Sequence, residues 1–292
     1  CRKQYFQQIA ISCRLKRFAP SEELPESQFQ SVIDFLKRPQ NKLVAFILAY
    51  LLMSSYFQMK NEYLSSLIDP YRVDFHFAIF NAIITDIITL LTLVWIVRFL
   101  NQTNFFANTR LDEFINYISD LNLYLKFFVF FLLNDFLQYW SHRLRHEVKV
   151  VWRFHKVHHT TEKLEWQSRF RGHPVSTFLD RIFVFLPTIL LGFKFAEVAS
   201  TLLTFRVIYD CFVHSSYKGD LQFLKYILVT PKFHRLHHLK VGSGEAKNFA
   251  TIFPLWDIVF GTSSFNENYE ENFGVKDKVN FTFKDLFLYP FR

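Results

Sequence analysis

Histidine is concentrated in three short clusters of this chain. Of its 11 histidines, ten lie between positions 142 and 238 of the 292 residues. Eight of them form the clusters HRLRH, HKVHH and HRLHH and are His142, His146, His155, His158, His159, His234, His237 and His238. Neutral imidazole is a common ligand of iron, zinc and copper, and most imidazoles are neutral near pH 7. The clusters therefore predict a metal site.

The spacing within each cluster favours a common direction for its side chains. Positions i, i+3 and i+4 of a helix lie on one face, so we expect each cluster to present its imidazoles from a single helical stripe. Eight neutral donors suit two six-coordinate ions with positions left open for a small molecule, whereas one tetrahedral zinc ion would use four ligands at most. The clusters therefore predict a two-metal centre.

Long apolar runs must position these clusters. They span residues 43–57, 77–97, 121–140 and 182–205. A helix that crosses a bilayer needs about 20 predominantly apolar residues, a length that the last three runs reach. Core helices of soluble proteins rarely stay apolar for this long on all faces. We expect three or four transmembrane helices, because the short run 43–57 either crosses the membrane, lies in its interface or re-enters.

The distribution of charge agrees with a membrane protein. The chain carries 34 Lys and Arg against 26 Asp and Glu, and residues 1–42 and 141–174 each contain eight of the basic residues. Basic segments beside apolar runs are typical of cytoplasmic loops and of contacts with anionic lipid. No basic face of a soluble domain is evident, so we expect no nucleic-acid partner. The scattered Cys1, Cys13 and Cys211 form neither a disulfide framework nor a CxxC metal site, which fits a reducing environment.

The predicted fold is an all-α membrane protein with three to four transmembrane helices and a cytoplasm-facing helical cap that carries the histidine-rich two-metal site. We expect four parts: a basic N-terminal segment (1–42), N-terminal hydrophobic helices (43–120), a histidine-box domain (121–265) and a C-terminal tail (266–292). The topology contains one conflict. Three spans counted from a cytoplasmic N-terminus put the clusters outside, unless run 43–57 does not cross, the N-terminus lies outside or another span precedes it.

The clusters carry a family resemblance. WSHRLRH, HKVHH, RGHP and HRLHH, followed by NFATIFPLWDIVFGT at 248–262, resemble the fatty acid hydroxylase and sterol desaturase superfamily of membrane-bound non-haem di-iron enzymes. The resemblance covers about residues 130–262 and includes the order and spacing HxxxH, HxxHH, HxxHH. It implies that the eight clustered histidines are the metal ligands and the catalytic residues. It also implies two iron ions with O2 as co-substrate, and zinc is expected to replace iron in recombinant protein because it binds imidazole tightly.

The same resemblance points to three further residues. Asp135 stands where family members commonly carry an Asp, seven residues and so two helical turns before His142. We expect it to accept an N–H from a ligating imidazole and to fix its tautomer; the alternative is a carboxylate that pairs with Lys or Arg in helix packing. His173, in RGHP, and His214, in FVHSS, are each expected either to complete a coordination sphere, or to support the ligands from behind or pack within the fold.

The segment WDIVFGT at 256–262 follows the third cluster. Its apolar residues are expected to close the cap, with Gly261 ending the helix. Asp257 either serves the metal site or caps this helix.

The predicted activity is oxidation of a lipid. A two-iron centre that binds O2 can remove hydrogen from an unactivated C–H bond, and a site at the membrane surface suits a fatty acyl, sterol or related substrate. Hydroxylation and desaturation have the same histidine spacing, so both stay open. The reaction needs two electrons, and the chain has no HPGG, CxxxxCxxC or GxGxxG motif. We therefore expect a separate electron donor of the cytochrome b5, ferredoxin or reductase type.

The expected location is an integral membrane protein with its active site facing the cytoplasm, in the endoplasmic reticulum of a eukaryote or the inner membrane of a bacterium. Two other functions fit the same residues. A non-enzymatic metal-binding or metal-transporting membrane protein would place ionisable residues within its spans, whereas these histidines lie beside the apolar runs. An inactive lipid-binding relative would have no need for eight intact cluster histidines.

Overall fold

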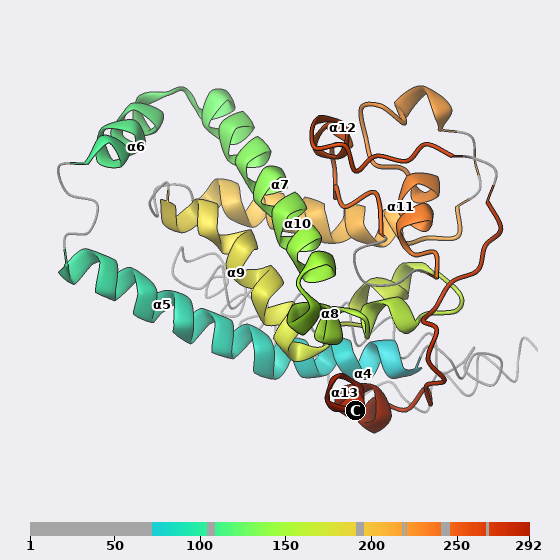
Figure 1. Cartoon of the computed structure of the whole chain (residues 1–292). Helices are drawn as coiled ribbons and strands as arrows, with labels where there is room; N and C mark the ends of the chain where they lie inside the picture. Colours follow the sequence, from blue (N-terminus) through green and yellow to red (C-terminus); the bar gives the residue numbers. More distant parts are fainter. Residues whose placement is uncertain are drawn as a thin grey trace, which may run out of the picture. The chain divides into compact units, whose positions relative to one another are not determined.

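The computed structural model (Figure 1) describes residues 72–103, 109–190, 196–217, 219, 221–240, 246–266 and 269–292. All of them belong to the second of the chain's two compact units, Ser54–Arg292. The basic segment 1–42 and the apolar run 43–57 lie outside the described residues.

The described residues are helical, as predicted. The elements are α4 (Arg72–Phe80), η3 (Asn81–Thr85), α5 (Asp86–Gln102), α6 (Arg110–Asp120), α7 (Leu123–Glu147), α8 (Lys149–His155), η4 (His158–Thr160), η5 (Trp166–Phe170), α9 (Pro174–Leu190), α10 (Ala196–Val213), η7 (Gln222–Leu224), α11 (Pro231–His237), α12 (Leu255–Val259), α13 (Phe283–Leu288) and η8 (Tyr289–Phe291). Within these residues the β-structure is one isolated bridge between Leu239 and Phe273. The fold class is therefore all-α.

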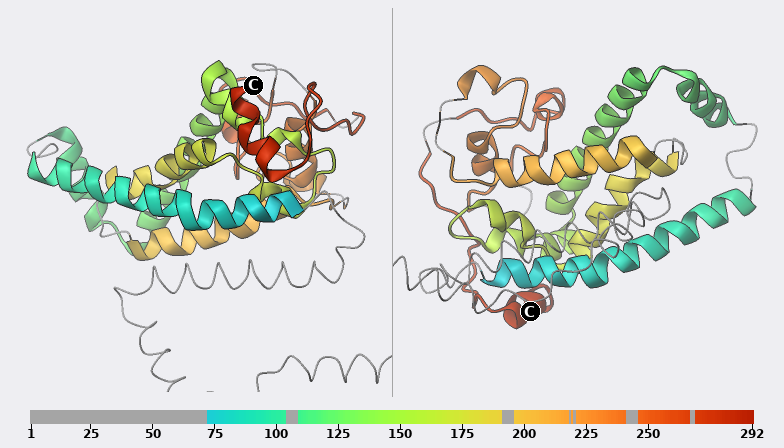
Figure 2. Two further views of the ribbon diagram at one scale, coloured as in Figure 1. Left: turned by 90° about the horizontal axis from the view of Figure 1, so that it is seen from below. Right: turned by 180° about the vertical axis from the view of Figure 1, so that it is seen from behind.

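One long helix contains the predicted run 77–97. The elements α4, η3 and α5 continue one another from Arg72 to Leu100, which is 29 residues and about 44 Å. Ile87, Leu91 and Trp95 are more than half exposed along it. Among the described residues this is the one helix that is long and apolar enough to cross a membrane. Its far end and α6 lie away from α11 and α12 (Figure 2).

The other predicted runs differ from the expectation of one span each. Run 121–140 forms most of α7, a 25-residue helix that continues into the first histidine cluster. Run 182–205 is not one helix, because α9 ends at Leu190 and α10 begins at Ala196. Helices of 17 and 18 residues are about 26 Å long, less than the ~30 Å bilayer core. Counting apolar residues did not detect this division, so three to four crossings stay a prediction.

A buried polar layer joins α7 to α9 and α10. The Arg206 guanidinium of α10 donates to the Asn134 side-chain oxygen at 3.1 Å and to that of Gln138 at 2.7 Å. Arg145, near the end of α7, donates to Asp180 of α9 at 2.8 Å. Buried polar groups are stable only where their partners are in place, so these bonds fix the register of the three helices. The end of α7 is thereby held against α9.

The C-terminal segment packs against the helices rather than trailing from them. Leu286 and Tyr289 are buried in a cluster with Val73, Phe77 and Val157. The Lys156 ammonium lies 3.8 Å from the centre of the Tyr289 ring, a cation–π contact that adds to this packing. Thus α13 and η8 connect the long helix to the segment that carries the second histidine cluster.

Leu286→Ala is predicted to destabilise the protein by about 2–5 kcal/mol, because it leaves a cavity in this cluster. Leu286 is 0% exposed, and its neighbour on the same helix, Leu288, is 39% exposed and serves as the control. Denaturant unfolding of the purified protein measures both variants. Equal small effects would mean that α13 does not pack as described.

Candidate metal centre

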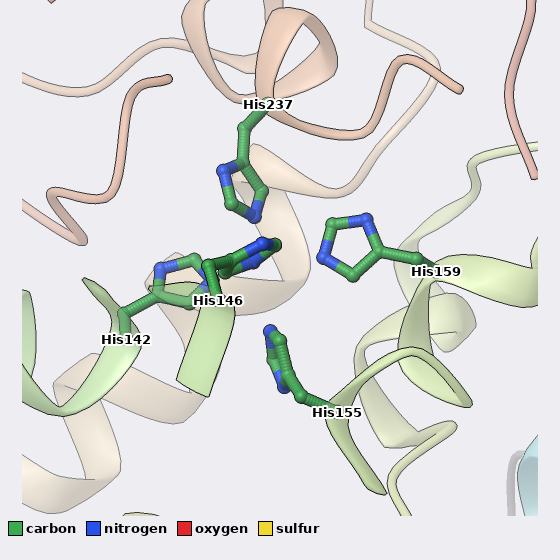
Figure 3. Close-up of side chains that lie close together, drawn as sticks. All are labelled: His142, His146, His155, His159 and His237. Atoms are coloured by element: carbon green, nitrogen blue, oxygen red, sulfur yellow. The ribbon is translucent and has the colours of Figure 1, made fainter. Parts of the chain in front are cut away.

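The clustered histidines form two groups of converging ring nitrogens. The five-histidine group contains His142, His146, His155, His159 and His237, and the four-histidine group contains His158, His214, His234 and His238. Within each group one nitrogen per ring lies within 4.8 Å of all the others. Figure 3 shows the five rings of the first group pointing toward a common centre. The groups adjoin each other, since the rings of His159 and His238 stack at 4.5 Å between centroids.

The first cluster follows the predicted helical pattern. His142 and His146 lie one turn apart in α7, with ring centroids 5.2 Å apart. This helix starts at the Asn122 cap, whose side chain accepts from the Leu125 amide, and has no Gly or Pro to interrupt it. The first stripe is therefore confirmed.

The second and third clusters do not form single stripes. The helix α8 ends at His155, and His158 and His159 follow in the separate 3₁₀ turn η4. The neighbours His158 and His159 enter different groups, and so do His237, the last residue of α11, and His238, its C-cap. Adjacent side chains point in different directions, and the helix ends increase their divergence. Each of these clusters therefore serves both groups.

Backbone carbonyls fix the orientation of four of the rings. Each ring places Nδ1 within hydrogen-bond distance of a carbonyl oxygen: His142 with Phe249 (2.9 Å), His158 with Arg171 (3.1 Å), His214 with Asp210 (2.7 Å) and His237 with Lys247 (2.8 Å). A carbonyl oxygen only accepts, so Nδ1 carries the proton and donates. In a neutral ring, Nε2 then has a lone pair available for a metal ion.

The four-histidine group fits a metal ion better than it fits hydrogen bonds among its own rings. The Nε2 atoms of His158 and His214 are 3.2 Å apart, and both are lone-pair acceptors in the tautomers just described. His234 Nε2 lies 3.0 Å from that of His214. Two nitrogens in adjacent positions of a six-coordinate ion, each about 2.1 Å from it, are about 3.0 Å apart. A cation between these atoms removes the repulsion between their lone pairs.

In the five-histidine group, ring nitrogens without a hydrogen-bond partner also indicate a metal ion. The Nε2 atoms of His155, His159 and His237 are buried and have no hydrogen-bond partner among the described residues. A buried polar atom without a partner is costly, and such atoms normally have a bound ligand or ion. The three atoms lie in one group whose nitrogens converge. The donors present therefore suit a metal ion in each group.

Burial keeps the rings outside α7 neutral. Loss of hydration lowers the pKa of His214 to about 4 and that of His237 to about 3. Burial, followed by the neighbouring histidines, also lowers the pKa of His158, His159, His234 and His238 well below 6.5. Burial, followed by the charge of Arg145, lowers the pKa of His155 in the same way. Protonated imidazole cannot bind a metal ion, so a low pKa keeps the rings available as ligands.

Asp135 has a different role from the predicted one. Its carboxylate oxygens accept from the Thr251 hydroxyl (2.8 Å), from the amides of Ile252 and Phe253 (both 3.1 Å) and from the Trp256 indole (2.9 Å). The expectation that it accepts from a ligating imidazole is wrong, and so is the alternative of an ion pair as its main contact. Asp135 instead fastens residues 251–256, which form a loop and the start of α12, to α7.

Asp257, which the sequence left open between metal site and cap, fixes the segment before this loop. Its carboxylate accepts from the amides of Phe249 (2.8 Å) and Ala250 (2.7 Å) and from the Thr262 hydroxyl (2.6 Å), and burial raises its pKa. The Phe249 carbonyl is the acceptor for His142. Asp257 therefore acts on a candidate ligand through one peptide unit. The signal in the sequence is a lone acid within an apolar segment. Gly261, at φ +69°, ends α12 as predicted.

Of the two additional candidate ligands, His214 lies in a histidine group and His173 does not. His214 follows α10 and belongs to the four-histidine group. His173 lies in neither group: its Nε2 is 3.2 Å from the Phe287 carbonyl and its Nδ1 accepts from the Val175 amide at 3.2 Å. With both nitrogens bonded to the protein, His173 connects the start of α9 to α13 and is not placed as a ligand.

The fold and site define a class of protein, a helical protein with two adjoining groups of buried imidazoles suited to two metal ions. Residues 127–262 match the family model described as fatty acid hydroxylase. The matched residues include both histidine groups.

Proteins similar to this chain include alkylglycerol monooxygenases and an ornithine lipid hydroxylase. The chain is 31% identical to alkylglycerol monooxygenase of Homo sapiens over 161 residues, which are 53% of this chain and 34% of that protein. It is 33% identical to alkylglycerol monooxygenase of Danio rerio over 132 residues, 45% of this chain and 29% of that protein. It is 30% identical to ornithine lipid hydroxylase OlsE of Rhizobium tropici over 134 residues, 45% of this chain and 39% of that protein. The matches thus span roughly a third of these relatives. No solved structure matches the chain significantly.

His214→Ala is predicted to lower the metal bound per chain, because it removes one of four converging donors, whereas His173→Ala keeps the wild-type content. Elemental analysis of zinc-loaded, purified protein measures this difference. If the two variants bind the same amount as wild type, His214 is not a ligand.

Asp257→Asn is predicted to cost about 1–3 kcal/mol of stability, because an amide oxygen replaces only part of a buried acceptor for three donors. Glu147→Gln is the control, since Glu147 pairs with Arg143 at the surface and such pairs contribute little. Denaturant unfolding compares the two. A larger loss from Glu147→Gln would contradict the assigned role.

Proposed function

We propose that this chain carries the catalytic centre of an O2-dependent lipid hydroxylase with two iron ions. The observation that carries the proposal is the convergence of nine histidines, eight of them buried and His158 partly buried, into adjoining groups of five and four. The proposal assigns His142, His146, His155, His159 and His237 to one ion and His158, His214, His234 and His238 to the other.

The donor set favours iron that keeps open positions. A six-coordinate ion has one position left in the five-histidine group and two in the four-histidine group. Imidazole suits iron, zinc and copper alike, and neither group includes a carboxylate from the described residues. Two iron ions held there would supply O2 activation and the removal of hydrogen from an unactivated C–H bond. Zinc is the expected substitute in recombinant protein.

The protein's own residues prepare the centre in three ways. The carbonyls of Phe249, Arg171, Asp210 and Lys247 set the tautomer and direction of four rings. Burial of the histidines excludes bulk water and keeps the rings unprotonated. The buried carboxylates of Asp135 and Asp257 hold the chain between residues 249 and 256 in place. A rigid, preorganised ligand shell is what a site needs to keep its geometry during catalysis.

A lipid is the proposed substrate, and hydroxylation is the proposed reaction. The relatives are named for alkylglycerol and for ornithine lipid, and their names state a monooxygenase and a hydroxylase. The helix Arg72–Leu100 is apolar and long enough for a membrane, and it is mostly exposed within the protein. We propose an integral membrane protein whose site faces the cytoplasm, with electrons delivered by a separate protein of the cytochrome b5, ferredoxin or reductase type.

Lipid mass spectrometry of cells with and without the chain tests this function. We expect a product one oxygen heavier than its precursor; a product two hydrogens lighter would identify a desaturase instead. His158→Ala and His237→Ala, one from each group, are predicted to abolish the product while the protein still inserts in the membrane. Product formation is normalised to the amount of inserted protein, with a matched electron donor present. Bound metal with no lipid product would favour a metal-binding protein, and absence of both would favour an inactive lipid-binding relative.

A further inference from the structure

The RGHP segment contributes to the metal centre through Arg171 rather than through His173. The Arg171 carbonyl accepts the Nδ1–H of His158 at 3.1 Å. The position of this carbonyl therefore determines where His158 directs Nε2, the atom that faces the other rings of the four-histidine group. A contact that fixes the position of Arg171 therefore also fixes the orientation of His158.

A buried ion pair holds Arg171. Its side chain is 2% exposed, and the guanidinium Nε donates to the carboxylate of Asp74, which is 0% exposed and lies in α4. The same guanidinium lies 3.4 Å from the Thr160 hydroxyl in η4, the turn that contains His158. Burying two charges is costly unless their geometry is closely defined, so this pair marks a constrained position.

A second bond from the long helix reaches the next peptide unit. Asn81 begins the π-helical turn η3, and its Nδ2 donates to the Gly172 carbonyl at 2.9 Å. The Thr85 hydroxyl donates to the other end of the Asn81 amide at 2.8 Å, which fixes the direction of that amide. A Cβ at Gly172 would lie 2.7 Å from the Thr177 hydroxyl, so the segment is closely packed. Single π-turns of this kind often occur at functional sites.

The five-histidine group has separate supports. The rings of His142 and His237 donate to the carbonyls of Phe249 and Lys247, in the segment that Asp257 fixes. None of these three hydrogen bonds involves the helix Arg72–Leu100. The carbonyl oxygens that accept from His142 and His237 therefore lie in a different part of the chain from the Arg171 carbonyl that accepts from His158.

We propose that Asp74 and Arg171, supported by Asn81, are positioning residues for His158, through which the apolar helix Arg72–Leu100 controls the metal affinity of the four-histidine group alone. This inference rests on the proposed function only in taking both groups as metal sites. It predicts that a substitution of Asp74 or Asn81 weakens the binding of one metal ion and leaves the binding of the other unchanged. An entirely structural role would weaken both ions together.

The experiment uses full-length protein loaded with Co²⁺ in detergent and titrated with a chelator. Metal per chain and the Co²⁺ absorption spectrum report the release of each ion. Asp74→Asn is expected to release one ion at about 10–100-fold lower chelator concentration, the usual size of effect for a residue behind a ligand, with the second ion unchanged. Asp74→Glu is the conservative variant and is expected to restore much of the lost affinity.

The matched control is Asp86→Asn. Asp86 lies in the same continuous helix and pairs with Arg181 of α9 at 3.0 Å, so this ion pair joins the helix to α9 and not to the RGHP segment. This variant is expected to release both ions as wild type does. If Asp74→Asn does not fold, Asn81→Leu replaces it, since it removes the bond to Gly172 and the bond from the Thr85 hydroxyl but leaves the ion pair between Asp74 and Arg171. Asn81→Leu is expected to weaken the same single ion.

Each outcome is decisive. Wild-type protein that binds fewer than two ions contradicts the proposed function itself. Wild-type protein that binds two ions, while Asp74→Asn or Asn81→Leu releases both at the wild-type concentration or weakens both equally, overturns the positioning role and leaves the proposed function intact.

Discussion

The rest of this structure depends on one electrostatic constraint, the convergence of neutral imidazole lone pairs inside the protein. The Nε2 lone pairs of His158 and His214 repel each other because the two atoms are only 3.2 Å apart, and the Nε2 atom of His234 lies 3.0 Å from that of His214. A metal ion turns the repulsion into coordination. For the ion to bind, each ring must present the correct nitrogen, and this requires a proton acceptor behind the ring.

Backbone carbonyls meet that requirement, and buried acids hold the chain segments that carry them. Asp257 fixes Phe249 behind His142, and the Asp74–Arg171 pair fixes the carbonyl behind His158. A backbone acceptor brings no charge into a low-dielectric interior, so the site needs few buried charges next to the metal ligands. As a consequence, segments that are distant in the sequence have to fold correctly before either histidine group is complete.

The long apolar helix takes part in this arrangement as well as being a candidate membrane span. Its apolar side chains are largely exposed, while Asp74 and Asn81 turn inward to the RGHP segment. A polar residue in an apolar helix is costly and usually has a defined role. Composition alone revealed the helix, but its two inward polar contacts are evident only in the folded chain.

The sequence by itself determined the local features: the eight ligand-type histidines, the helical fold class, the α7 stripe and the end of α12 at Gly261. These follow from side-chain chemistry and from spacings of a few residues. Tertiary structure alone decided which group each ring joins, that His214 is included and His173 is not, that Asp135 binds a loop, and that run 182–205 becomes two helices. Those outcomes depend on contacts between residues 20 to 120 positions apart, such as His214 with His234 and Asp135 with Phe253, which no local spacing encodes.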